Sequence, residues 1–554
     1  MEDSFVELNG RERAKVLLDK NTGKEIVGPF DNIISPHLEP QGIVPESDDG
    51  IIIIKGKLAG KPVVIISIEG SFQGGGIGEV SGAKIVATLE KVLKDNKIGK
   101  TIYPILILDT GGVRLQEANY GLLSISEIQN VIIALKKYVP VVGIIPGIVG
   151  SFGGMSITAA ILSYLITTPK ARIGLNGPEV IEQEAGPREF DSSDKNLIWD
   201  TLGTRQRLKT GLVDEVVEDS INKIKNSLNS AIEKRKEARR TDQSNFYLSL
   251  LDKIDFTKPL TTTSYQNLYK SIKNKKHALP EAVSSKQKFD NSRGRIWFEA
   301  LTGIKNAKSE IPTILYANKN SNAYLAIVPD KHNRFPRVRN GEAGLEEGFA
   351  LGNIINRIIK EDQNKKAKRP IIAIVDVPSQ AYGYKEELIG IHLALASSAS
   401  AYAKARQTGH PVIAFIAGDA VSGGFLAHGL QSNRLIALDD TSITIQAMSK
   451  ASAARITQRT IPELEEATKH VPAMAYDIDN YNKLGALYDL VSGVTSWKAT
   501  PDSIKKVNAI IQKGIDSTKD KPNDLHFRYQ TPIAKKSGRK ATLRVRKAIN
   551  EEWG

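Results

Sequence analysis

The stretch PVVGIIPGIVGSFGGMSITAAILSYLITTPKARIGLNGP, residues 140–178, decides the expected fold. Its apolar run at 141–145 is typical of a buried strand, and the glycine-rich segment 147–154 predicts a tight turn into a helix that begins at Met155. The first backbone N–H groups of such a helix have no partner inside it, and the helix dipole favours negative charge there. The stretch therefore predicts an oxyanion site at a strand-to-helix turn.

The same order of strand, glycine turn, helix and strand recurs about 270 residues later. Three pairs of segments align: PVVGIIPG with PVIAFIAG at 411–418, SFGG at 151–154 with SGG at 422–424 after one inserted residue, and the residues from Met155 without a gap with those from Phe425. A chain of 554 residues that repeats so large a unit predicts an α/β protein with two large domains, each with its own core.

Composition excludes several classes of site. The chain contains no Cys, which rules out disulfides, Cys-ligated zinc, iron–sulfur clusters and thiol nucleophiles and suits the cytoplasm. The acidic and then amphipathic N-terminus does not resemble a signal peptide, and no apolar run approaches the ~18 residues that span a bilayer. We expect a soluble, cytoplasmic protein with no membrane contact, no metal and no cofactor bound in this chain.

The formal net charge of +14 raises the alternative of a nucleic-acid or other polyanionic partner. Much of the excess charge lies outside the repeated units, at 253–288 and 535–547, and no nucleic-acid motif is present, so no nucleic-acid partner is expected. Composition predicts these domain limits: a first domain at 1–240, a basic linker at 241–290, a second domain at 291–505 and a basic C-terminal tail at 506–554.

A second glycine-containing loop precedes the glycine turn in each half. DTGGVRLQEANYG at 109–121 follows a predicted strand in the first half, and DVPSQAYGYKEELIG at 376–390 occupies the same place in the second. Glycines let the backbone approach a ligand closely, so each pair of loops can supply two N–H groups to one carbonyl oxygen. The alternative is a pair of tight turns without chemistry.

The GGGIG segment at 74–78 is a weak dinucleotide pattern without the expected acidic residue, so a nicotinamide site is not predicted.

These motifs resemble the carboxyltransferase branch of the crotonase superfamily. More closely, SFQGGGIGEVSGAKI, DTGGVRLQEAN, PSQAYGYKEELIGIHLALA, HPVIAFIAGDAVSGGFLAHG and VPAMAYDIDNYNKLGALY are similar to the β and γ subunits of malonate decarboxylase, here joined in one chain. The resemblance spans roughly residues 4–491. It implies two tandem crotonase-like domains of the ClpP/crotonase, carboxyltransferase type, with repeated ββα units, the first β-like and the second γ-like.

The resemblance implies an enzyme that decarboxylates a malonyl thioester to the acetyl thioester and CO₂, without biotin, through an enolate. The thioester would be carried by an acyl-carrier subunit on a phosphoribosyl-dephospho-CoA arm, and an acyl-carrier transferase subunit would be a second partner; a homodimer is compatible with this architecture. Two alternatives stay open. The chain could transfer the carboxyl group to a biotin carrier protein, or it could be a scaffold that only docks other subunits, although a scaffold has no need of convergent N–H donors.

Carried over by motif, the resemblance implies two oxyanion holes made of backbone amides. The first would hold the thioester oxygen, and the second would face the departing carboxylate. The catalytic residues predicted in this way are Gly111, Gly112, Val113, Gly153 and Gly154 in the first half and Gln380, Ala381, Tyr382, Gly383, Ser422, Gly423 and Gly424 in the second.

The group that protonates the product carbanion is left open by the sequence. The candidates for a donor or a water-holding group are Tyr382, His428, Ser151 and Gln380, each with packing as the alternative role. The predicted substrate-binding residues are Arg114, Ser151, Phe152 and His428. Further cations that could meet the carboxylate or the phosphates of the arm are Arg172, Lys450 and Arg455, although exposed Arg and Lys are usually solvated.

Overall fold

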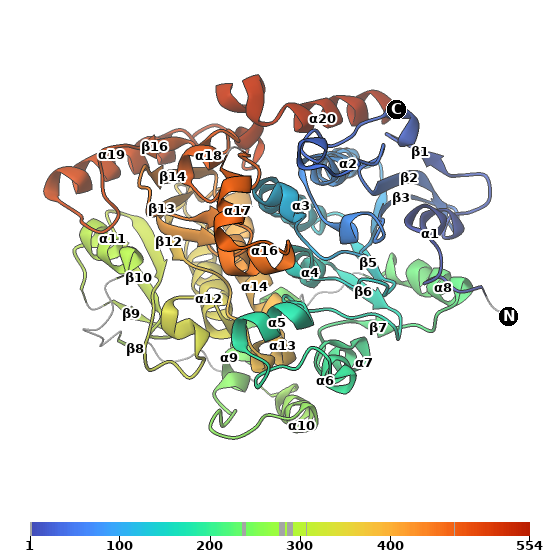
Figure 1. Ribbon diagram of the computed structural model, residues 1–554, viewed down its shortest axis with the longest axis horizontal. Coiled ribbons are helices and arrows are strands. Elements are labelled where there is room, and N and C mark those ends of the chain that lie inside the picture. Colours follow the sequence, from blue (N-terminus) through green and yellow to red (C-terminus); the bar gives the residue numbers. More distant parts are fainter. Residues whose placement is uncertain (1–2, 235–239, 276–282, 285–291, 306, 470) are drawn as a thin grey trace. The chain divides into compact units, whose positions relative to one another are not determined.

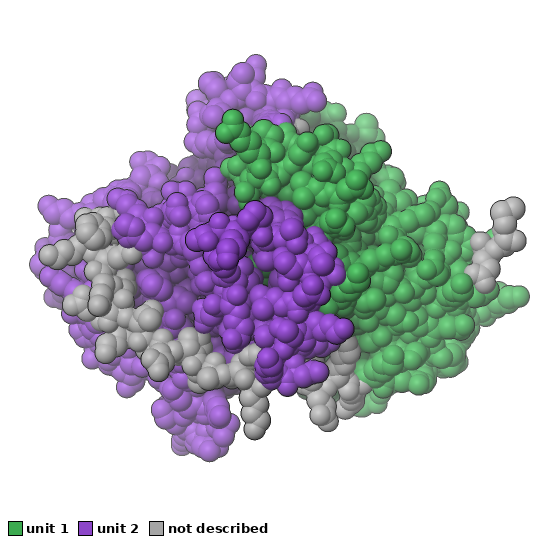
Figure 2. Space-filling model, turned by 90° about the horizontal axis from the view of Figure 1, so that it is seen from below, with its two compact units in different colours: residues 1–240, 387–393, 539–554 green, residues 241–386, 394–538 purple. Residues whose placement is uncertain are grey.

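The computed structural model describes residues 3–234, 240–275, 283–284, 292–305, 307–469 and 471–554. The chain divides into two compact units, each built from separate segments of the sequence (Figure 2). Unit 1 contains residues 1–240, 387–393 and 539–554, and unit 2 contains residues 241–386 and 394–538. Each unit has its own sheet and its own covering helices.

The sheet of unit 1 follows sequence order from β1 to β7 (Figure 1). The pairs β1/β2 and β2/β3 are antiparallel, and all later neighbours are parallel. Parallel neighbours need crossover connections, which α2, α3 and α4 provide. The strands are β1 (Lys24–Glu25), β2 (Ile51–Leu58), β3 (Lys61–Ile68), β4 (Tyr103–Ile107), β5 (Val142–Ile145), β6 (Tyr164–Thr167) and β7 (Glu215–Val216).

Alternating apolar side chains bury both faces of this sheet. Ile54, Ile65, Ile107 and Ile144 belong to a core that also takes in side chains of α1 and α8, while α2 packs on β2 and β4 and against α3. The helices of unit 1 are α1 (Gly10–Val16), α2 (Glu79–Lys97), α3 (Ala118–Leu135), α4 (Gly153–Ile161), α5 (Pro178–Ala185), α6 (Lys195–Leu202), α7 (Thr204–Lys209), α8 (Ile221–Ala231) and α20 (Lys540–Glu552).

The sheet of unit 2 repeats this plan. Its order is β10-β11-β12-β13-β14-β16, with β15 paired to β13; only β10/β11 is antiparallel among these described pairs. The crossovers α12, α14 and α15 take the places of α2, α3 and α4. The strands are β10 (Ile314–Lys319), β11 (Asn322–Ile327), β12 (Ile371–Val377), β13 (Val412–Val421), β14 (Arg434–Leu438), β15 (Ile445–Gln446) and β16 (Asp489–Val491).

The remaining described elements are mostly helices, two of which contain residues of both units. They are α9 (Ser244–Leu251), α10 (Thr262–Ile272), α11 (Arg293–Thr302), α12 (Leu345–Glu361), α13 (Tyr384–Ile389), α14 (Ile391–Gln407), α15 (Ser422–Ala427), α16 (Lys450–Ile456), α17 (Ile461–Thr468), α18 (Ile478–Asn482), α19 (Pro501–Asp516), and the separate strand pair β8 (Val283–Ser284) and β9 (Lys308–Ser309). The prediction of an α/β fold in which a large unit is repeated is confirmed.

The segment predicted as a basic tail, 506–554, contains helices that pack on other elements. Most of α19 lies in it and packs on β13 and β14, whereas α20 packs on α2. In α19 the side chains of Val507, Ile511 and Ile515 are buried at a four-residue spacing, and Val545 and Ile549 play the same part in α20. The composition of this segment suggested a solvated tail because its Lys and Arg residues outnumber this narrow apolar stripe.

The predicted linker 241–290 also differs from the structure where the structure describes it. The helices α9 and α10 lie in this range and pack within unit 2, and α9 also packs on α12. The residues 276–282 and 285–290 of the predicted linker lie outside the described residues. In the described part of the chain, every helix is too short or too polar to cross a bilayer.

Candidate functional site

The two glycine loops of unit 1 lie side by side beyond the carboxyl ends of β4 and β5. Thr110 and Ser151 form a short parallel bridge, and the N–H of Phe152 donates to the carbonyl of Thr110 at 3.0 Å. Gly112 and Gly153 then meet so closely that a Cβ on Gly112 would lie 2.9 Å from the Cα of Gly153. Their φ angles of +104° and +55° also favour glycine. The loops are therefore held together at the position that the sequence predicts for an oxyanion hole.

Most of the predicted N–H groups at this turn are already satisfied. Three of them have these acceptors: Gly111 donates to the carbonyl of Gly74 at 2.8 Å, Gly112 donates to the hydroxyl oxygen of Thr110 at 3.0 Å, and Gly153 donates to the carbonyl of Leu175 at 2.9 Å. These three amides shape the loops and are not available to a ligand.

Two N–H groups, those of Val113 and Gly154, have no acceptor among the described residues. Val113 forms a parallel bridge with Ile77 whose hydrogen bonds run through Gly112 and Arg114, so the N–H of Val113 faces away from Ile77. Gly154 is the second residue of α4, where no intrahelical acceptor exists. Each loop thus contributes one open backbone donor, and we call this pair the open amide pair.

The corresponding loop of unit 2 carries a polar side chain. Ala343 bridges Gln380 in parallel as Ile77 bridges Val113, and the N–H of Ala381 donates to the carbonyl of Ala343 at 2.8 Å. Gln380 is therefore the structural counterpart of Val113. The N–H of Ala381, which the sequence predicted as part of a second hole, is used inside the backbone.

The glycine turns correspond one residue differently from the sequence alignment. Gly153 begins α4 with φ of +55°, and Ser422 begins α15 with φ of +58°. Gly154 therefore corresponds to Gly423, although the alignment pairs it with Gly424. The shift arises because β13 runs directly into its helix at residue 422, whereas β5 ends early and a loop follows it.

In unit 2 the N–H of Gly423, the counterpart of Gly154, is not open. The Oε1 atom of Gln380 accepts the N–H of Gly423 at 2.9 Å, and the Gln380 side chain is only 6% exposed. The predicted second hole, which was to face the departing carboxylate, is thus filled by the protein's own amide side chain. The sequence could not reveal this, because Gln380 and Gly423 are distant in sequence and only the fold brings them together.

Tyr382, Gly383 and Gly424, which were also predicted for the second hole, have close contacts inside the protein. The hydroxyl groups of Tyr382 and Ser379 are hydrogen-bonded at 2.8 Å. A Cβ on Gly383 would lie 2.1 Å from a carboxylate oxygen of Glu386, and one on Gly424 would lie 2.6 Å from the carbonyl of Ser379. These glycines permit close packing.

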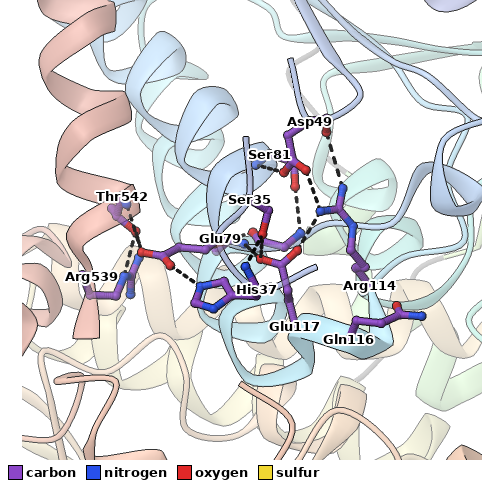
Figure 3. A network of polar contacts seen from close by, with 12 residues as sticks. Ser35, His37, Asp49, Glu79, Ser81, Arg114, Gln116, Glu117, Arg539 and Thr542 are labelled. Carbon is purple, nitrogen blue, oxygen red and sulfur yellow. Dashed lines mark hydrogen bonds and ion pairs between the residues drawn. The ribbon is translucent and has the colours of Figure 1, made fainter. Parts of the chain in front are cut away.

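Arg114, predicted to bind substrate, is buried in an ion-pair network instead (Figure 3). Its Nη1 atom donates to Asp49 and to Glu117, each at 2.7 Å. Burial raises the pKa of Asp49 to about 6, although the Arg114 charge acts in the opposite direction. The resemblance implied that Arg114 binds substrate, but its guanidinium is turned inward, where it holds two carboxylates.

His428, also predicted to bind substrate, is fully buried in unit 2. Its Nε2 atom lies 2.9 Å from the carbonyl of Ile374 and its Nδ1 atom lies 2.9 Å from the hydroxyl of Tyr402. A carbonyl only accepts, so Nε2–H donates and Nδ1 accepts from Tyr402. Burial lowers the pKa of His428 to about 4, which keeps the ring neutral. The side chain connects α14 to β12.

Ser151 and Phe152 stay at the turn of unit 1. The hydroxyl of Ser151 is buried and has no hydrogen-bond partner among the described residues. The guanidinium of Arg172 lies 5.9 Å from the ring centre of Phe152 and 6.0 Å from that of Trp199. Ser151 is therefore the one proposed proton-donor candidate in the described chain whose polar side-chain group is not already bound.

Two further cations predicted from sequence lie on α16. Lys450 forms an ion pair with Glu465 on α17 at 2.7 Å, and its ammonium lies 5.5 Å from the ring of Tyr476. Arg455 is exposed. No contact of either side chain with the glycine loops of unit 2 is found in the described residues.

One carboxylate at the site was missed by sequence reasoning. Glu387 is fully buried in unit 1, where it accepts the N–H of Leu175 at 3.1 Å, the N–H of Asn176 at 2.7 Å and the side-chain amide of Asn176 at 2.9 Å. Burial raises its pKa to about 7. Leu175 is the residue whose carbonyl holds Gly153. No sequence signal connects residues so far apart.

Comparison with known proteins adds independent information. A family model described as the carboxyl transferase domain matches residues 8–247, and one described as the malonate decarboxylase gamma subunit matches residues 338–553. Over 248 residues the chain is 41% identical to the malonyl-S-ACP:biotin-protein carboxyltransferase MADC of Malonomonas rubra, which covers 43% of this chain and 78% of that protein.

Two more relatives also cover only part of the chain. The malonyl-S-ACP:biotin-protein carboxyltransferase MADD of Malonomonas rubra is 38% identical over 169 residues, 30% of this chain and 58% of that protein. The crystal structure of a Pseudomonas malonate decarboxylase hetero-tetramer in complex with malonate is 46% identical over 48% of this chain and 98% of that chain, with a TM-score of 0.48.

Proposed function

Since the chain belongs to the malonate decarboxylase family and joins a carboxyl transferase domain to a gamma-subunit-like region, we propose that it decarboxylates a malonyl thioester held on an acyl-carrier subunit. The products are the acetyl thioester and CO₂. The observation that carries this proposal is the open amide pair of Val113 and Gly154, one donor from each glycine loop of unit 1.

The chemistry needs donors of this kind. When the bond to the carboxylate breaks, its electron pair moves onto the α-carbon and the thioester oxygen, and an enolate forms. Two fixed N–H groups that point at that oxygen stabilise the developing charge, and each such donor is worth about 3–4 kcal/mol in other oxyanion holes. Backbone donors held by the Gly111, Gly112 and Gly153 hydrogen bonds need no reorganisation during the reaction.

The enolate carbon must then take up a proton. We assign this step to the hydroxyl of Ser151, or to a water bound by it, because that group is buried beside Phe152 and is not engaged by another described side chain. His428, Tyr382 and Gln380 are less suited, because each already has a hydrogen-bond partner.

The second candidate is carboxyl transfer from the malonyl thioester to a biotin carrier protein. The relatives MADC and MADD favour it, because both are named as malonyl-S-ACP:biotin-protein carboxyltransferases. Direct decarboxylation is favoured by Gln380, because its side-chain oxygen already accepts the N–H of Gly423. Unit 2 therefore has no preformed amide pair for biotin, the group that would accept the carboxyl group. Both reactions pass through the same enolate in unit 1.

The proposal implies partners. The malonyl group would arrive on an acyl-carrier subunit through a phosphoribosyl-dephospho-CoA arm, and an acyl-carrier transferase subunit would load it. Arg172, partly exposed beside Phe152 and Trp199, is placed to meet a negative group of that arm. The names of the relatives, with their malonyl-S-ACP substrate, support a carrier-bound substrate.

The test is CO₂ release from a malonyl thioester on the carrier or on CoA, followed over time with the purified chain and with avidin present to sequester biotin proteins. Release that continues in avidin supports direct decarboxylation. Release that stops, and resumes only when a biotin carrier protein is added back, makes the chain a carboxyltransferase and rejects the first proposal.

A further inference from the structure

Unit 1 contains two short segments that come late in the sequence, 387–393 and 539–554. Hydrogen bonds connect each segment to a glycine loop of the first half, one to the residue before Gly154 and the other to the residue after Val113. The contacts on each side form a continuous chain of buried hydrogen bonds, which can be followed from the late segment to the loop.

On the Gly154 side, the path of hydrogen bonds starts at Glu387. Its carboxylate holds the backbone of Leu175 and Asn176 through N–H donors at 3.1 and 2.7 Å. The carbonyl of Leu175 in turn accepts the N–H of Gly153 at 2.9 Å, directly before Gly154. Gly174 leaves room for this carboxylate, because a Cβ there would lie 2.8 Å from it.

On the Val113 side, the path of hydrogen bonds starts at Thr542 in α20 (Figure 3). The N–H and the hydroxyl of Thr542 both donate to Oε1 of Glu79 at 2.9 Å. Glu79 is the first residue of α2, and its own N–H donates to Glu117 at 3.1 Å. Glu117 then accepts from Arg114 at 2.7 Å, directly after Val113.

The groups on this second path are almost completely enclosed. Glu79, Glu117 and Thr542 are each at most 2% exposed. The other oxygen of Glu79 lies 2.6 Å from Nε2 of His37, and Arg539 pairs with Glu127 at 3.1 Å, so α20 is fixed at more than one point. Buried hydrogen bonds of this kind restrict movement, and removal of one member leaves its partners unpaired.

We propose that Glu387 and Thr542 are positioning residues that set the distance and direction between the Val113 and Gly154 N–H groups. This inference rests on the proposed role of that pair in holding the enolate oxygen. Neither residue touches the reacting atoms in this scheme; each acts through the loop that it holds. Small displacements matter here, because a misplacement of about 1 Å can lower a rate on the order of a hundredfold.

The experiment uses the full chain with Glu387→Gln and Thr542→Val. Glutamine keeps one acceptor oxygen but turns an NH₂ group toward the N–H donors of Leu175 or Asn176, and valine keeps the shape of threonine without its hydroxyl. The controls are Glu551→Gln, the same change on the exposed side of α20, and Thr542→Ser, which restores the hydroxyl.

We expect kcat to fall about tenfold or more in Glu387→Gln and about threefold to tenfold in Thr542→Val, with KM within about twofold of the wild type. Thr542→Ser and Glu551→Gln should keep the wild-type kcat. Thermal melting and gel filtration give the folded fraction, so each rate is expressed per folded chain. A purely structural role would lower the folded fraction or the melting temperature and leave kcat per folded chain unchanged, and that result would overturn the inference.

The same variants separate this inference from the proposed function. If the wild type proves to transfer carboxyl groups to a biotin carrier protein, the enolate is still formed in unit 1, and the variants are then measured in that transfer reaction. An unchanged transfer rate in both variants would reject the positioning role, whatever the fate of the carboxyl group.

Discussion

The glycine turns of the two units share a backbone plan but differ in one side chain. In unit 1 the residue at the bridge position is Val113, whose side chain has no polar atom, and the N–H of Gly154 stays open. In unit 2 the residue at the same position is Gln380, whose side-chain oxygen accepts the N–H of Gly423. The comparison teaches that a single neighbouring side chain decides whether a backbone N–H at this turn stays open.

The largest effect is expected from Gly112→Ala, which separates the two loops of unit 1. A Cβ there would lie 2.9 Å from both Gly153 Cα and the Phe152 carbonyl, at a φ of +104°. We expect kcat for CO₂ release to fall about a hundredfold or more, as for loss of one oxyanion donor.

The control for this variant is Gly60→Ala. Gly60 also has a positive φ, +78°, but a Cβ there would have no neighbour within 4 Å. Both variants carry backbone strain and only Gly112→Ala disturbs the loops. Equal loss of activity in the two variants would show that strain, and not loop separation, determines the rate.

Val113→Gln makes unit 1 resemble unit 2. The Val113 side chain is partly exposed, so a glutamine there has room to turn its oxygen onto the N–H of Gly154. We expect kcat to fall about tenfold to a hundredfold with little change in melting temperature, because the glutamine oxygen competes with the thioester oxygen for the Gly154 N–H. Val113→Ala has no side-chain acceptor for that N–H and should retain activity within about threefold. Full activity in Val113→Gln would contradict the assignment of this pair.

The pH dependence of unit 2 tests how its own turn is anchored. Burial lowers the pKa of His428 from 6.5 to about 4. The unfolded chain therefore binds the proton first as the pH falls, so the stabilisation present above pH 6.5 is lost progressively toward pH 4.

Between pH 6.5 and 5.0 this loss should amount to about 1.5 kcal/mol, measured by hydrogen exchange of the β12 and β13 amides. His428→Gln should remove that part of the pH dependence, because glutamine does not titrate. An unchanged slope in the variant would mean that His428 is not a neutral anchor in the folded protein.

The smallest effect is expected from Gln380→Val, which makes unit 2 resemble unit 1. Loss of the amide oxygen leaves the Gly423 N–H unpaired, which should destabilise unit 2 by about 1 kcal/mol in the same exchange measurement. CO₂ release by unit 1 should stay within about threefold of the wild type. A large loss of decarboxylation would show that Gln380 takes part in the reaction. It would overturn the view that the glycine turn of unit 2 is inactive because Gln380 binds its N–H.

Much of the fold could be predicted because it rests on local patterns. The apolar runs, the glycine turn before Met155 and its recurrence at 422–424 indicate two parallel-rich units, and the structure has both. The helices within 506–554 were not predicted, because the buried stripe of Val507, Ile511 and Ile515 is narrow among many basic residues. Composition averages over a helix, whereas burial depends on one face of it.

The site was predictable only to the level of loops. Five amides of the first half were proposed, and backbone hydrogen bonds leave Val113 and Gly154 as the open pair. Arg114 and His428 were assigned to substrate from their position in motifs, but both side chains turn inward to buried partners. The direction of a side chain depends on the packing around its loop, which a motif does not contain.

The sequence by itself determined that this chain is a duplicated α/β protein with glycine turns suited to an oxyanion, because strand periodicity and glycine spacing are local properties. Only the tertiary structure decided which turn is open. That outcome depends on contacts between distant residues, such as Gln380 with Gly423 and Glu387 with Leu175 and Asn176, and on burial, which sets the charge state of His428. Such contacts form only when the folded backbone brings the partners to within a few ångströms, so neither spacing nor composition encodes them visibly.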